Sequence, residues 1–172
     1  MCISIVFAAN IPDTEAGNFK KRIEKLGNLY QYGIGMGEEM LLPGAGPEVK
    51  RVLSAPDIIF EVHDLPEPHC ACDIDHDIRT GSKLGKMSRF FDFIREVLEY
   101  KGLKRLSLLF FQDEFPGADH IREEFGTFDD LADLLNRWNT WQVAGYEPTR
   151  RAYYIADESP LLFTVTGKKI SQ

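Results

Sequence analysis

The chain has 172 residues, of which 44% are hydrophobic and 27% are charged, and its net charge is −7. This length is enough to bury a core, and twelve Phe, six Tyr and two Trp residues exclude a disordered protein, so we expect one globular domain over residues 1–172. The acidic balance argues against direct nucleic-acid binding, because that affinity depends on neutralising phosphates with Lys and Arg.

The first part of the chain predicts two strands and a helix. β-branched and apolar residues predict a buried strand over Cys2–Ala9. Apolar residues spaced three and four apart predict a helix over Thr14–Leu26, and the aromatic and apolar residues of Leu29–Ile34 predict a second strand. Glycines at every second position then predict a loop, or strand ends at which the backbone approaches a neighbouring group closely. These glycines are Gly33, Gly35 and Gly37.

The middle of the chain predicts two more strands. Ile58–His63 consists mostly of apolar and β-branched residues, which is typical of a strand. Two prolines break the chain after it, and His69–Ile78 then alternates with a period of two. This alternation predicts a strand whose solvent face carries a row of carboxylates. The row consists of Asp73, Asp75 and Asp77.

The last part of the chain predicts two helices and three strands. Apolar residues at helical spacing predict a helix over Lys86–Lys101, and a buried strand follows over Leu103–Phe111. Thr127 precedes two aspartates and predicts the start of another helix, because acid in the first turn favours the helix dipole. Arg151–Ala156 and Leu161–Thr166 predict two closing strands joined as a hairpin.

Together these elements predict an α+β fold. We expect a single-domain sandwich with a mixed or mostly antiparallel sheet and about three helices packed on one face. No apolar run approaches the ~20 residues of a membrane helix, and no secretory signal is recognisable at the start. The three cysteines, two of them one residue apart, are a poor disulfide framework. We therefore expect a soluble cytoplasmic protein that does not bind a membrane.

Negative charge is concentrated in two windows of the sequence. Residues 57–77 contain seven acidic residues and no Lys or Arg. Residues 113–133 contain eight acidic residues and a single Arg, so each window has a net charge of −7 and the remaining residues sum to +7. Such segregation predicts a strongly negative surface that attracts a basic protein partner. The candidate partner-binding residues are Asp73, Asp75, Asp77, Asp113, Glu114, Asp119, Glu123 and Glu124.

All four histidines also lie in these windows, which raises the alternative of a metal site or a hydrolase using segment 63–77. Sulfur, imidazole and carboxylate groups bind transition metals, and a carboxylate beside a histidine can act in acid–base catalysis. The candidate metal ligands are His63, His69, Cys72 and His76. On an extended strand, however, His76 would lie about 13 Å from Cys72 at ~3.3 Å per residue, too far to chelate one ion together.

No nucleophile or phosphate-binding motif accompanies these residues. The absence of such motifs favours a non-catalytic protein without a cofactor. The acidic windows favour a binding protein, for which an immunity or inhibitor protein that neutralises a basic toxin or nuclease is one form. The sequence does not give the partner, the strand order or the oligomeric state.

Overall fold

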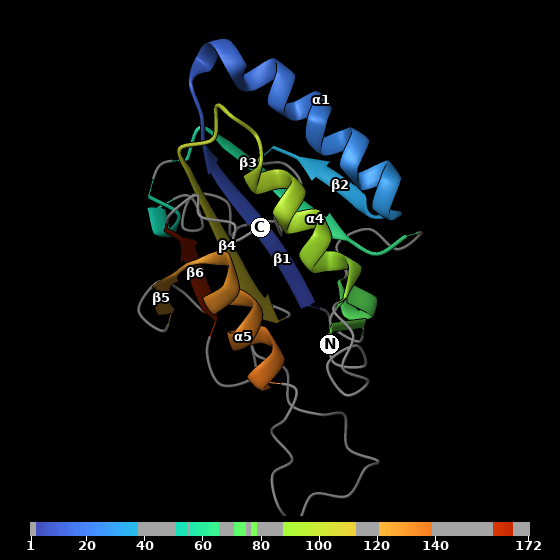
Figure 1. The fold of residues 1–172 in the computed structure, drawn as a ribbon, viewed down its shortest axis with the longest axis vertical. Coiled ribbons are helices and arrows are strands. Elements are labelled where there is room, and N and C mark those ends of the chain that lie inside the picture. Colours follow the sequence, from blue (N-terminus) through green and yellow to red (C-terminus); the bar gives the residue numbers. More distant parts are fainter. Residues whose placement is uncertain are drawn as a thin grey trace, which may run out of the picture.

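A computed structural model describes residues 3–37, 51–54, 56–65, 71–74, 77–78, 88–112, 121–138 and 160–166. Its helices and strands form two layers, a sheet and a set of helices, as Figure 1 shows. The elements are β1 (Ile3–Asn10), α1 (Asp13–Tyr30), β2 (Gly33–Met36), β3 (Ile58–His63), α4 (Arg89–Leu98), β4 (Arg105–Gln112), β5 (Arg122–Gly126), α5 (Phe128–Trp138) and β6 (Leu161–Val165).

The six strands form one mixed sheet in the order β2-β3-β1-β4-β6-β5. All neighbouring strands are antiparallel except β5 and β6, which are parallel. The elements from β1 to β4 have the connectivity of a split βαβ arrangement, in which β3 inserts between β1 and β2. The unit β5-α5-β6 extends the sheet beyond β4. The predicted α+β fold with a mostly antiparallel sheet is confirmed.

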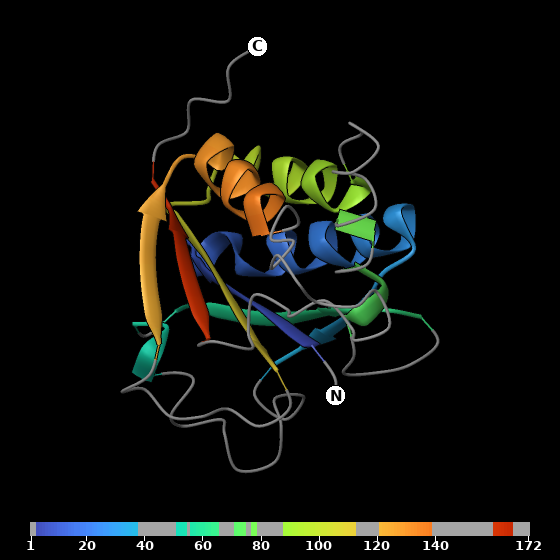
Figure 2. The ribbon, with the colours of Figure 1, turned by 90° about the horizontal axis from the view of Figure 1, so that it is seen from below.

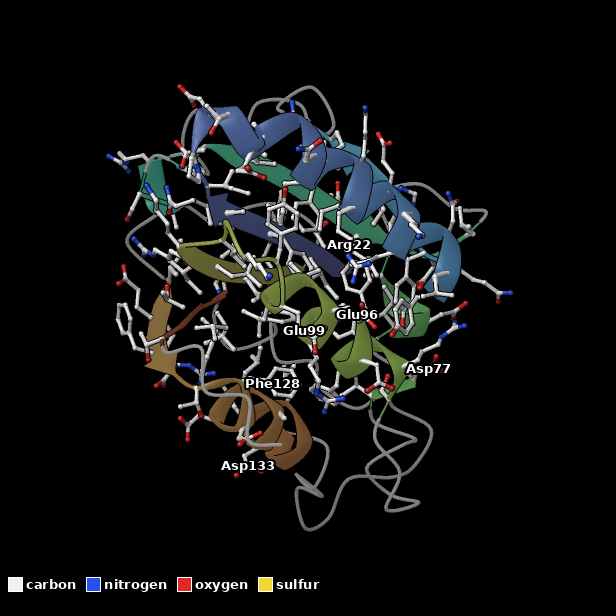
Figure 3. The ribbon with its side chains drawn as sticks, turned by 45° about the horizontal axis from the view of Figure 1, so that its top comes forward. Arg22, Asp77, Glu96, Glu99, Phe128 and Asp133 are labelled. Carbon is white, nitrogen blue, oxygen red and sulfur yellow. The ribbon has the colours of Figure 1, made fainter. Side chains whose placement is uncertain are left out.

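The three long helices lie on the same side of the sheet (Figure 2), as the sequence predicted. The sheet and these helices enclose a core rich in phenylalanine, because every second residue of the central strands points to this side. Phe7 lies at its centre and stacks on Phe60 with 4.8 Å between ring centroids. Its edge also meets the rings of Phe90 and Phe93 from α4, at 6.2 and 5.9 Å. Arg22 of α1 and Glu96 of α4 form an ion pair between the two helices (Figure 3).

The opposite face of the sheet is buried as well. Its apolar cluster includes Leu53, which lies outside the sheet and packs on strand residues. The residues of this cluster are Val6, Ala8, Leu53, Ile59, Leu109, Phe111 and Leu162. The same face also carries buried polar side chains, among them those of Ser107 and Thr164, whose hydroxyl oxygens lie 2.8 Å apart. Burial on both faces explains why these strands are nearly continuous apolar runs.

Two predicted elements differ from the structure at their ends. The first helix continues to Tyr30, so the predicted strand over Leu29–Ile34 is wrong in its first part and begins only at Gly33. Gln31 ends the helix with a φ of 59°, in the left-handed conformation, and the Tyr32 N–H then donates to the Gly27 carbonyl at 2.8 Å. The sequence concealed this end because the stop residue is not a glycine.

The predicted strand over His69–Ile78 is wrong in its described part. Residues 72–74 and 77–78 are helical. Ala71, Ile74 and Ile78 are buried, and their spacing of three and four residues is that of a helix face. The alternation of acidic and other residues masked this spacing. His69, Cys70, Asp75 and His76 lie outside the described residues.

Two predictions near the C-terminal end of the sheet also need correction. The acidic stretch before Thr127 contains a strand, β5, that the sequence did not predict. The predicted hairpin is wrong, because β4 and β5 occupy the two edges of β6 and leave no place for a third strand. Residues 151–156, the other half of that hairpin, lie outside the described ranges.

The start of α5 confirms the predicted cap. The Thr127 hydroxyl accepts from the Asp130 N–H at 3.2 Å, and the Asp130 carboxylate accepts from the Thr127 N–H at 2.7 Å. This reciprocal pair satisfies two backbone N–H groups that the helix leaves open.

We expect Thr127→Ala to lower the free energy of unfolding by about 1 kcal/mol, because the Asp130 N–H loses its acceptor. Urea titration followed by circular dichroism measures this change. Thr14→Ala is the matched control, since Thr14 is exposed in the first turn of α1. An equal loss in the two variants would contradict the role of the cap.

Candidate functional site

Carboxylates of the first acidic window mostly hold the fold together where the structure describes them. Asp57 accepts a hydrogen bond from the backbone N–H of Ile11 at 2.8 Å. Glu61 is only 4% exposed on the face of the sheet opposite the helices. Asp77 pairs with Arg89, with 3.5 Å between Oδ2 and Nε. Glu61 is therefore removed from the surface, and Asp57 and Asp77 make contacts within the protein, although Asp57 is itself exposed.

Asp64 has a structural role at the start of the helical residues 72–74. Its two carboxylate oxygens accept from the backbone N–H groups of Asp73 at 2.6 Å and Ile74 at 3.1 Å. Burial raises the pKa of Asp64 above its ordinary value, and the two N–H donors partly offset this rise. Asp73 itself is exposed, so it is the one described carboxylate of the predicted row that faces solvent without an ion pair in the structure.

Arg89 is engaged by a second group besides Asp77. Its guanidinium lies 5.2 Å from the ring centroid of Tyr32, in a cation–π contact. Tyr32 is 3% exposed, and burial raises the pKa of its hydroxyl. The Tyr32 hydroxyl therefore stays neutral, and the positive charge of Arg89 compensates the negative charge of Asp77. The local charge of this part of the protein is lower than the sequence window suggests.

The candidate metal ligands His63 and Cys72 lie on opposite sides of the sheet. His63 alternates with Val62, which belongs to the core under the helices, whereas Cys72 packs against that core. The His63 Nδ1 lies 3.0 Å from the carbonyl oxygen of Asp64, so this nitrogen donates. Among the residues that the structure describes, no three His, Cys, Asp or Glu side chains are placed to hold a metal ion.

Gly33 is required beneath the His63 ring. A Cβ at Gly33 would lie between 2.0 and 2.7 Å from three atoms of the imidazole. This is the close backbone approach that the alternating glycines predicted, and it is confirmed at this position. The imidazole lies against β2 and is 8% exposed. It therefore has a packing role in the structure.

We expect Gly33→Ala to lower the free energy of unfolding by about 1–3 kcal/mol, because the new methyl group overlaps a buried ring. The double variant Gly33→Ala/His63→Ala should lose less than the sum of the two single variants, since removing the ring makes room for the methyl group. Thermal and urea unfolding of the four proteins measure this coupling. Strict additivity would show that the two residues are not in contact.

The second acidic window forms an exposed surface where the structure describes it. β5 is the last strand of the sheet, and Glu123, Glu124 and Phe125 are all exposed, Phe125 by 61%. The strand contains one cation, Arg122, whose Nε lies 3.8 Å from the Glu124 carboxylate. The two glutamates are adjacent in the sequence and therefore point to opposite faces of the sheet edge.

The packing of α5 determines which of its residues face solvent. Its inner side is apolar and buried, and Phe128 anchors it through an edge contact with Phe91 at 6.4 Å and a cation–π contact with Arg95 at 5.1 Å. The other inner residues are Leu131, Ala132 and Leu135. Because the acidic residues fall between these positions, helical spacing places them on the outer side, where they are exposed. These residues are Asp129, Asp130 and Asp133, and Figure 3 labels Asp133 on this helix.

A tight turn joins the two acidic elements. A Cβ at Gly126 would lie 2.7 Å from the Asp130 Cβ and 3.0 Å from the ring of Phe163, so only glycine allows the strand to pass so close to the helix. We call the exposed carboxylates of this unit the β5–α5 acidic surface. It consists of Glu123, Glu124, Asp129, Asp130 and Asp133.

The predicted partner-binding residues thus divide into separate groups. Glu123 and Glu124 belong to the β5–α5 acidic surface, whereas Asp77 is paired internally and Asp73 lies at a different place in the fold. Asp113, Glu114 and Asp119 lie outside the described residues. The sequence pattern had not assigned Asp129, Asp130 and Asp133 a binding role, although the apolar spacing of α5 was enough to place them on its solvent side.

Comparison with known proteins gives no identification. No protein-family model matches this chain, and no curated protein or solved structure shows significant similarity to it. Within the described ranges, no helix is long and apolar enough to cross a bilayer. The chemistry of the exposed surface is therefore the basis for a functional assignment.

Proposed function

We propose that this protein is a non-catalytic binding protein that docks a basic protein partner on the β5–α5 acidic surface. The observation that carries this proposal is the exposure of five carboxylates on one strand and one helix. Glu124 points to the side of the sheet on which α5 lies and Glu123 to the other side, so the carboxylates flank the outer edge of β5 on both faces. A surface of one sign attracts an oppositely charged partner over a distance and speeds its association.

A second feature supports a docking role. Phe125 is a large apolar side chain that is 61% exposed and points to the same face of β5 as Glu123. Aromatic residues are enriched where proteins bind each other, and an apolar contact ringed by charged groups is the usual composition of a specific interface. Charge would then bring the partner to this surface, and Phe125 would supply apolar area once it is bound.

The narrower role of an immunity or inhibitor protein fits this proposal as one form of it. A basic toxin or nuclease has a cationic active site, and the β5–α5 acidic surface would cover it. The reducing cytoplasm is the proposed location, since three cysteines, two of them one residue apart, are a poor disulfide framework. This part of the proposal rests on charge complementarity alone.

Affinity chromatography on the immobilised protein tests the proposed function. Extract of the native source is loaded at low salt and eluted with a salt gradient. We expect a basic protein to be retained and then released as the ionic strength rises, because salt screens exposed charges beyond about 10 Å at 0.1 M. Retention that does not respond to salt, or retention of acidic proteins only, would contradict the proposal.

A further inference from the structure

The outer edge of β5 has backbone groups that the sheet does not use. The Arg122 N–H donates to the Pro160 carbonyl at 2.8 Å, and the Gly126 carbonyl accepts from the Thr166 N–H at 2.6 Å. Together with the parallel register, these bonds show that Arg122, Glu124 and Gly126 direct their backbone groups toward β6. The N–H and C=O groups of Glu123 and Phe125 must therefore point away from the sheet.

No strand among the described residues pairs with this outer edge. Figure 2 shows β5 at the margin of the sheet, with α5 above it. An edge strand with open backbone groups can add a further strand from another chain. We propose that the partner binds by adding a basic strand to the outer edge of β5. This inference rests on the proposed function and specifies how the partner and β5 would be arranged.

The side chains of β5 define the chemistry of that strand. Cross-strand neighbours lie about 5 Å apart, so opposite charges there are favourable and like charges are not. Lys or Arg residues would face Glu123 and Glu124, and an apolar residue would face Phe125. A second copy of this chain is disfavoured, since an antiparallel pair centred on Glu124 would place the two Glu124 carboxylates opposite each other.

Amide hydrogen exchange measured by NMR tests this geometry, with a short end-capped peptide that repeats Lys-Lys-Val as the probe, so that lysines can face both glutamates and a valine can face Phe125. At low salt we expect the peptide to bind and to slow exchange of the Glu123 and Phe125 amides at least tenfold, because these N–H groups gain an acceptor. The amides of Arg122 and Glu124 should change little, since β6 already protects them. A lysine–proline repeat of equal charge cannot form a strand, so it should leave all four amides unchanged.

Proline substitution provides an independent comparison. Glu123→Pro removes an outward N–H without breaking a bond to β6, whereas Glu123→Gln removes only the charge. We expect the proline variant to bind the lysine–valine peptide at least tenfold more weakly than the glutamine variant. Circular dichroism tests whether both variants are folded. If the proline variant is unfolded, the exchange measurement on the unaltered protein alone decides whether the peptide binds as an added strand.

The outcomes separate the two proposals. Peptide binding without slower exchange at Glu123 and Phe125 would overturn strand addition and leave side-chain docking on the acidic surface intact. Absence of binding to either cationic peptide at low salt would overturn both. Protection that increases with protein concentration and needs no peptide would identify a second copy of this chain as the occupant and so overturn the proposed basic strand.

Discussion

The double substitution Glu123→Lys/Glu124→Lys is expected to weaken binding of the basic partner by about a hundredfold or more, or nearly 3 kcal/mol. Two attractive charges become repulsive at the centre of the proposed contact, and like charges across an interface cost several kcal/mol. Isothermal calorimetry or surface plasmon resonance with the purified partner measures the change. Most of the loss at low salt should appear in the association rate.

A matched reversal elsewhere separates this local effect from the change in net charge. Glu24 on α1 and Glu99 at the end of α4 are exposed and lie outside the β5–α5 acidic surface. Glu24→Lys/Glu99→Lys alters the net charge by the same amount as the reversal on β5. We expect it to reduce affinity only slightly. Equal losses in the two variants would show that the partner senses total charge and has no defined docking surface here.

The largest effect on stability is expected for Phe7→Ala, which should lower the free energy of unfolding by about 3–5 kcal/mol. Phe7 is fully buried and stacks on Phe60 while its edge meets two rings of α4, so its removal leaves a cavity between the sheet and the helices. Urea or thermal unfolding measures the loss. A loss of this size is a large fraction of the roughly 5–15 kcal/mol that stabilises a typical domain.

Phe125→Ala is the matched control for Phe7→Ala. The same atoms are removed from a side chain that is 61% exposed, so we expect a change within about 0.5 kcal/mol. The two substitutions thus contrast a packing role with a surface role. If Phe125→Ala were as destabilising as Phe7→Ala, Phe125 would belong to the core and could not serve the proposed interface.

Strong local patterns made much of the fold predictable. The strand over Ile58–His63 has the predicted bounds because four of its six residues are apolar and both of its faces are buried, so no helical period competes. The helix within Lys86–Lys101 was predictable from its apolar stripe, and Ser88 fixes its start by accepting from the Phe90 N–H. These elements carry the information for their own conformation.

Elements that depend on distant residues were not predictable. β5 consists mainly of charged residues with poor strand propensity, and it exists because Leu161–Val165 pairs with it from far along the chain. The helical residues 72–74 depend on Asp64, which lies beyond a proline-rich break and binds their backbone N–H groups. In both cases the residues that stabilise the observed conformation lie far away in the sequence, so the local pattern does not reveal it.

The candidate site was predictable in composition but not in arrangement. The sequence identified Glu123 and Glu124, yet it treated the two acidic windows as equivalent. The structure separates them, because Glu61 is buried and Asp64 and Asp77 are half-buried in contacts within the protein, whereas all five carboxylates of the β5–α5 acidic surface are exposed. Charge counted along the chain does not show which carboxylates the fold itself neutralises.

Carbodiimide labelling of carboxylates, read by mass spectrometry with and without the basic partner, tests the central claim most directly. In the free protein we expect fast labelling of Glu123, Glu124 and Asp129 and slow labelling of the buried Glu61. The partner should protect the first three and leave the exposed Glu24 and Glu99 unchanged. Protection of Glu24 and Glu99 with unaltered labelling of Glu123 and Glu124 would place the contact elsewhere and contradict the account.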